Sequence, residues 1–166
     1  MKKILAAILL ALLLFTPQVF AAAAKAITPT IEGPEVWYNG QEVYRIKIVL
    51  VSTGAAADEF SLKDELTTDF DADYAQYWMD KLSGGILYEL VTDPGVQPDA
   101  TYTLSFDCEL GGNLLDMAAL SATVTEHTDF STDLGYNPVF WNDIDITMGD
   151  LGTENDSTTI YIYIVK

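Results

Sequence analysis

The stretch EVWYNGQEVYRIKIVLV, residues 35–51, decides the expected fold. Asn39-Gly40 lies between two runs rich in β-branched and aromatic residues, which is the strongest short signal for a β-hairpin. A two-residue type I′ turn needs positive φ at both central residues, and Asn and Gly tolerate it. In the second run one face is entirely apolar, and the other face carries Arg45 and Lys47 together with Val43, Val49 and Val51. This alternation predicts a strand whose core face is Tyr44, Ile46, Ile48 and Leu50.

Later runs repeat the two-residue alternation. Residues 101–110, TYTLSFDCEL, place Tyr102, Leu104, Phe106, Cys108 and Leu110 on one face, so the single cysteine is expected in the core. Residues 86–92, 119–126 and 158–165 also favour strands, and 59–62 a short one. Residues 139–148, VFWNDIDITM, alternate with an apolar face of Phe140, Ile144, Ile146 and Met148.

Turn residues separate these runs about every 8–12 positions, as in all-β sandwiches. We therefore expect a mainly β protein, an antiparallel β-sandwich of seven to nine strands, Ig-like or jelly-roll-like, with one short helix. A small outer-membrane β-barrel is the alternative for an exported β-rich chain of this length.

One helix is expected, from Asp71 to Leu82. Tyr74, Tyr77, Trp78 and Leu82 recur at helical spacing, which predicts that they form its buried face. Ser83-Gly84-Gly85 provides the C-terminal stop.

The first 21 residues have the order of a secretory signal peptide. Lys2 and Lys3 precede the apolar run ILAAILLALLLF, and small residues follow up to a cleavage site expected after Ala21. We expect residues 22–34 to be an extended N-terminal segment and 35–166 a single sandwich domain. The protein is therefore expected to be secreted, or to lie in the periplasm or at the cell surface of a bacterium.

The chain is strongly acidic, with a net charge of −17 that becomes −19 when Lys2 and Lys3 leave with the signal peptide. Nucleic-acid binding is excluded in practice, because it depends on Lys and Arg neutralising phosphates. One cysteine allows no intramolecular disulfide, and no stretch after the leader is long and apolar enough to predict a transmembrane helix.

The acidic stretch DFDADYAQYWMD, residues 69–80, is a candidate calcium site. Asp69, Asp71, Asp73 and Asp80 occupy positions 1, 3, 5 and 12 of an EF-hand count, although Tyr74 stands where the loop needs glycine. The same aspartates also fit the N-terminus of a helix, where they cap free amides. No cofactor is expected apart from this calcium alternative.

A second candidate site is WNDID, where Trp141, Asp143 and Asp145 would project from one strand face. An aromatic ring beside carboxylates suits sugar binding. The alternative is a packed tryptophan beside an acidic edge that discourages aggregation.

Catalysis is not expected. Asp143 and Asp145 lie too close along one strand to flank a glycosidic bond. The single histidine, His127, is expected in a polar loop, and the chain has no G-x-S-x-G nucleophile motif, so a hydrolase is the weakest alternative.

The C-terminal run Ile160–Lys166 is apolar on both faces. It is expected either to be an internal strand of the monomer or to pair with a protein partner or another copy by strand addition.

From Gly84 onward, the order GGILYELVTDPG, DATYTLSFDCELGGNLL and VFWNDIDITMGDLG followed by TTIYIYIV resembles small β-rich proteins of unassigned role encoded in phage and prophage structural gene clusters. The resemblance implies a non-catalytic β-domain used in assembly or surface display. The expected function is therefore an exported structural or surface binding module, and a carbohydrate- or calcium-binding module is the alternative.

Overall fold

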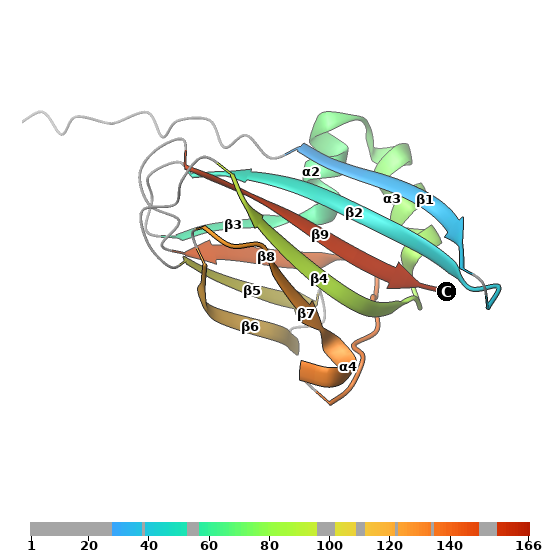
Figure 1. Ribbon diagram of the computed structural model, residues 1–166. Helices are drawn as coiled ribbons and strands as arrows, with labels where there is room; N and C mark the ends of the chain where they lie inside the picture. Colours follow the sequence, from blue (N-terminus) through green and yellow to red (C-terminus); the bar gives the residue numbers. More distant parts are fainter. Residues whose placement is uncertain are drawn as a thin grey trace, which may run out of the picture.

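The computed structural model describes residues 28–37, 39–52, 57–95, 102–108, 112–121, 123–133, 135–149 and 156–166 (Figure 1). The expected signal peptide and residues 22–27 lie outside these ranges. The strands are β1 (Thr28–Val36), β2 (Glu42–Val51), β3 (Ala57–Ser61), β4 (Ile86–Pro94), β5 (Tyr102–Cys108), β6 (Gly112–Leu120), β7 (Glu126–Asp129), β8 (Ile144–Gly149) and β9 (Ser157–Val165). The helices are α2 (Leu62–Asp69), α3 (Ala72–Leu82) and α4 (Phe130–Asp133).

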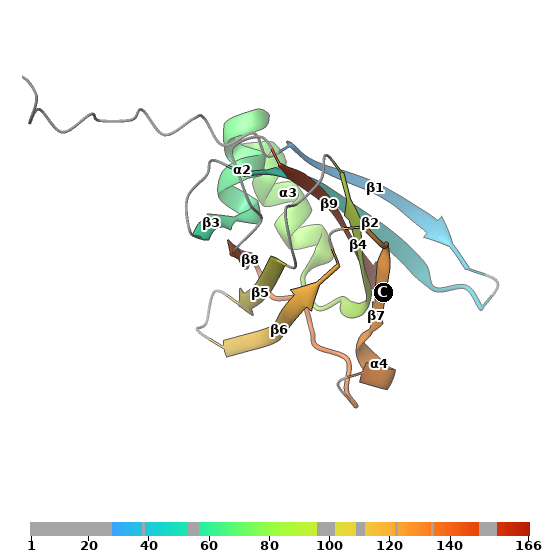
Figure 2. The same cartoon turned by 60° about the vertical axis from the view of Figure 1, so that its left-hand side comes forward.

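The strands form two separate antiparallel sheets. The five-stranded sheet has the order β1-β2-β9-β4-β7, and the four-stranded sheet has the order β3-β8-β5-β6. This confirms the antiparallel β-sandwich, because the described strands stay in two sheets and do not close into the barrel that was the alternative. Helices α2 and α3 fill the opening between the sheets on one side, where α2 contacts β1, β3 and β8 (Figure 2).

The core lies between the facing sides of the two sheets and the helices. The alternation of β2 is confirmed, because Tyr44, Ile46, Ile48 and Leu50 are all fully buried. The opposite sheet contributes the predicted residues of β5 and β8, which are Tyr102, Leu104, Phe106, Ile144, Ile146 and Met148. The side chain of Cys108 and the whole of Leu110 lie outside the described part of the chain.

The hairpin between β1 and β2 is confirmed, but its turn is not a two-residue type I′ turn. Trp37 N–H donates to the Gln41 carbonyl at 2.9 Å, and Gly40 N–H donates to the Trp37 carbonyl at 2.8 Å. Gly40 has a φ of +84°. A longer loop that ends in a left-handed glycine therefore connects the strands.

Helix α3 begins where the sequence predicts. Asp71 is its N-cap, and its carboxylate accepts the Tyr74 N–H at 2.7 Å. The predicted buried face is partly wrong, because Tyr77 is 58% exposed while Ala75, Met79 and Leu82 are buried. Tyr74 and Trp78 are partly buried and pack against the core.

Helix α2 is not expected from the sequence. The short strand predicted at residues 59–62 ends at Ser61, whose hydroxyl accepts the Asp64 N–H at 3.1 Å and starts the helix. Ser61 followed by Asp64 and Glu65 is an N-terminal helix signal that could have revealed it.

The expected strand at residues 119–126 is also wrong. β6 ends at Leu120, and the Ser121 hydroxyl then accepts the N–H groups of Thr123 and Val124 at 3.2 and 3.1 Å. This turn passes the chain to β7 in the other sheet, which contains His127 rather than leaving it in a loop.

Edge strand β1 begins earlier than expected, since residues 28–32 of the predicted extended segment pair with β2. A bulge interrupts the pairing, so that Glu32 lies opposite Arg45 and Glu35 lies opposite Val43. From one pair to the next, β1 therefore advances by three residues while β2 advances by two. The extra residue brings both glutamates to the outer face, although strict alternation would place them on opposite faces.

Strand β9 is the central strand of the five-stranded sheet, bonded to β2 on one edge and β4 on the other. Strand addition through Ile160–Lys166 would need a free edge, and both edges are occupied. The internal-strand alternative is therefore correct. No helix among the described residues is long and apolar enough to cross a membrane.

Gly33→Ala is expected to destabilise the protein by roughly 1–3 kcal/mol, measured by urea unfolding. Gly33 has a φ of +118° in the β1 bulge, and an added Cβ would lie 2.7 Å from the Val43 carbonyl oxygen. Gly84→Ala is the matched control, because its φ is +78° but nothing lies within 4 Å of an added Cβ. Equal losses for the two variants would contradict this role of the bulge.

Candidate functional site

The outer face of the five-stranded sheet carries aromatic and charged side chains in rows that cross all five strands. Strand pairing places Glu32, Arg45, Tyr163, Glu89 and Asp129 in one row, from β1 to β7. The next row contains Thr30, Lys47, Tyr161, Val91 and His127. We call this surface the outer face.

Arg45 is held in place on β2, next to the middle strand of the outer face. Its Nε donates to Glu32 Oε2 at 3.0 Å, its Nη2 donates to the same oxygen, and its guanidinium lies 5.7 Å from the centre of the Tyr161 ring. The hydrogen bond to Glu32, and then the interaction with the Tyr163 hydroxyl, raise the pKa of Arg45. The guanidinium is therefore ordered and its charge is largely balanced by Glu32.

A second bulge brings another ring to this surface. In β4, Leu87 pairs with Ile164 and Glu89 pairs with Tyr163, so that Tyr88 is the extra residue. The Tyr88 ring meets the Trp37 ring edge to face, with centroids 5.2 Å apart and planes at 82°. This contact orients Trp37 at the end of the hairpin.

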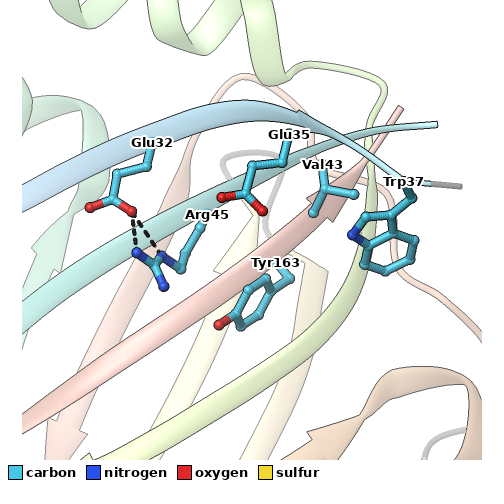
Figure 3. Close-up of a pocket in the computed structure, with 6 residues that line it drawn as sticks. All are labelled: Glu32, Glu35, Trp37, Val43, Arg45 and Tyr163. Atoms are coloured by element: carbon cyan, nitrogen blue, oxygen red, sulfur yellow. Dashed lines mark hydrogen bonds and ion pairs between the residues drawn. The ribbon is translucent and has the colours of Figure 1, made fainter. Parts of the chain in front are cut away.

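Trp37 and Tyr163 border a small hollow of about 70 Å³, which Glu32, Glu35, Val43 and Arg45 also line (Figure 3). Small-molecule pockets usually exceed about 300 Å³, so this hollow has room for one chemical group and not for a whole ligand. Val43, which is 5% exposed, provides its apolar part.

The carboxylate of Glu35 extends over this hollow (Figure 3). The Glu35 side chain is exposed and makes no hydrogen bond or ion pair with any other described residue. Because Glu32 balances Arg45, Glu35 leaves the hollow with a net charge of about −1. The hollow thus combines two rings, an apolar patch and a free carboxylate.

The predicted calcium stretch does not form an EF-hand loop. Asp69 ends α2, Asp71 caps α3, and Asp73 lies in the first turn of α3. Asp80 lies further along α3, where its carboxylate accepts Gln76 Nε2 at 2.7 Å. Most of the twelve residues are helical, and the described residues contain no group of three potential ligands positioned to hold a metal. The helix-capping alternative describes this stretch.

Trp141, Asp143 and Asp145 do not share a strand face. Asn142 has a φ of +51°, and β8 begins only at Ile144, so that the alternation is broken before the strand. Trp141 is 53% exposed, whereas Asp143 is buried. The predicted sugar site is therefore wrong in its geometry.

Asp143 has a structural role. Its carboxylate accepts the Ser61 hydroxyl at 2.5 Å, the Lys63 N–H at 3.0 Å and the Ile144 N–H at 2.8 Å. It therefore joins the start of α2 to the start of β8. Asp145 lies on the outer side of the four-stranded sheet, where burial and then the nearby Asp143 raise its pKa, with Glu59, Asp107 and Asp64 adding to the effect.

His127 lies in edge strand β7, and its Nδ1 is 2.8 Å from Glu89 Oε1. The side chain is well exposed and belongs to the rim of the outer face. A second, more open hollow of about 310 Å³ lies over β5, β6 and β8. Its lining has no aromatic ring and one charged residue, Asp116, so it offers fewer anchoring groups than the outer face.

Sequence reasoning missed the residues of the hollow. The alternation of β2 does place Arg45 and Lys47 opposite the core face, and β9 shows Tyr161 and Tyr163 between isoleucines. Which of these side chains become neighbours depends on strand order and on the two bulges. No local pattern in the sequence contains that information.

The sequence matches no protein-family model and no curated protein. What the chain does is therefore inferred from the chemistry of its surface.

Asp145→Asn is expected to raise the urea midpoint at pH 7. Because its pKa is raised in the folded state, folding disfavours the ionised carboxylate, and the variant removes that cost. The gain should shrink as pH falls through the raised pKa and vanish below about pH 3.9, where the carboxyl is protonated in both states. Asp143→Asn, which weakens three hydrogen bonds, should instead lower the midpoint. A midpoint at pH 7 that falls for Asp145→Asn would refute this interpretation.

Proposed function

We propose that this protein is an exported, non-catalytic β-sandwich that acts as a structural or surface binding module, and that it binds a basic protein partner through the outer face. The observation that carries the proposal is the set of rings on this face, Trp37, Tyr88, Tyr161 and Tyr163, together with the fixed guanidinium of Arg45, which contacts the Tyr161 ring. Trp, Tyr and Arg are the residues that most often dominate binding energy at protein interfaces.

Preorganisation supports this use of the face. The contacts of Arg45 with Glu32 and Tyr161, and of Trp37 with Tyr88, order these side chains before any partner arrives. Each rotamer-rich side chain that is already fixed saves about 0.5–1.5 kcal/mol on association. A regular sheet surface also presents its side chains on a rigid support.

Charge supports a basic partner. A chain with a net charge of −17 repels another copy of itself and attracts a cationic surface. The signal-peptide pattern of residues 1–21 supports a location outside the cytoplasm. The resemblance to small β-rich proteins of unassigned role from phage and prophage structural gene clusters supports a role in assembly or display.

Carbohydrate binding is the second candidate, because the same half-buried rings of the outer face could stack on sugars. The size of the hollow favours the protein partner, since about 70 Å³ does not enclose a sugar ring. Sugars would therefore have to stack on the rings of the outer face outside the hollow, as on a flat platform.

The purified protein is expected to bind immobilised poly-L-lysine at 150 mM salt and to ignore dextran, as measured by biolayer interferometry. Trp37→Ala should weaken the binding of poly-L-lysine at least about tenfold, because it removes one of the aromatic anchors at the hollow. Trp141→Ala is the matched control, since it removes an exposed tryptophan that does not line the hollow and should leave the affinity unchanged.

Equal effects of the two tryptophan substitutions would overturn the assignment of the outer face. Binding of dextran with no binding of poly-L-lysine would replace the basic protein by a polysaccharide.

A further inference from the structure

The hollow beside Trp37 is small, negatively charged and bordered by rings, and these three properties together restrict what it accepts. We infer that it is a receptor for the ammonium group of a lysine side chain on the partner protein. This inference rests on the proposed function and adds to it the partner group that enters the hollow.

The size of the hollow suits an ammonium group. A volume of about 70 Å³ has room for a head group of a few heavy atoms, and it is well below the roughly 300 Å³ at which small-molecule pockets begin. A lysine ammonium is a compact point charge on a flexible apolar stem. Val43 offers an apolar contact for the methylenes of that stem.

The net negative charge of the hollow favours a cation. The cation of Arg45 does not repel an incoming ammonium strongly, because Glu32 accepts two hydrogen bonds from its guanidinium. Glu35 then remains as the unpaired charge over the hollow, without a partner among the described residues. An ammonium group placed there replaces hydrogen bonds to water by charge-assisted hydrogen bonds to the Glu35 carboxylate, and it has three N–H donors for them.

The aromatic rings at the hollow also favour a cation. Cations are attracted to the faces of Trp and Tyr rings within about 6 Å of the ring centre, and recognition of substituted ammonium groups by aromatic side chains is the established use of this interaction. Trp37 and Tyr163 lie at the hollow on either side of Val43 (Figure 3). The same sheet already uses such a contact internally, between Arg45 and Tyr161.

The β1 bulge is what makes this arrangement possible. Gly33 adopts its φ of +118° within the bulge, and the extra residue places Glu35 on the same face as Glu32. Without the bulge one glutamate would point inward, and the hollow would lose either its free carboxylate or the group that balances Arg45.

The test is an NMR titration of the ¹⁵N-labelled protein with Nα-acetyl-L-lysine amide, following the Trp37 indole N–H signal. A saturable shift is expected with this probe, and none with the uncharged isostere Nα-acetyl-L-norleucine amide. Glu35→Gln should weaken the binding of the lysine amide roughly fivefold, because one direct ion contact is lost. Asp133→Asn removes the same charge from an exposed position on α4 and should change nothing.

Three results would overturn the inference: equal shifts with norleucine amide, unchanged affinity in Glu35→Gln, or a response to choline without one to lysine amide, which would indicate a lipid headgroup instead. If lysine amide fails while poly-L-lysine binding still depends on Trp37, the receptor role of the hollow is wrong and the proposed function stands. If both fail, both are wrong.

Discussion

Strand β9 lies in the middle of the five-stranded sheet and is bonded along both edges, and the rest of the molecule depends on this placement. Its inward residues, Ile160, Ile162 and Ile164, are buried at the centre of the core. Its outward residues, Tyr161 and Tyr163, form the middle of the outer face. One strand therefore provides both the packing that stabilises the fold and the rings that the proposed function uses.

The two bulges explain how an ordinary sheet surface acquires a binding hollow. Regular alternation would give each strand one fixed set of outward residues. The bulge in β1 adds Glu35 to the outer face beside Glu32, and the bulge in β4 releases Tyr88 to contact Trp37. Bulges occur often where a side chain has to be redirected next to a functional site. The surface chemistry thus results from local departures from the strand pattern.

The sequence predicts well what depends on neighbours along the chain. The alternation around Tyr44 and around Leu104 identifies core strands, and Asp71 marks the start of α3, because burial and capping follow local periodicity. The sequence does not predict the features that depend on contacts between distant segments of the chain. The positive φ of Asn142 breaks the alternation that would have put Trp141 and Asp145 on one strand face. Asp143 accepts a hydrogen bond from Ser61, 82 residues earlier in the chain, and thereby holds the start of α2. Strand order and register are likewise set by pairing across the whole chain, which no local pattern specifies.

Native-state hydrogen exchange of the purified protein tests the central position of β9 most directly. The amides of Ile160 to Ile164 are expected to exchange only through global unfolding, with protection equal to the free energy of unfolding measured in urea, while amides of edge strand β7 exchange through smaller openings. Fast exchange along β9, at rates no slower than those of β7, would contradict the central position of β9.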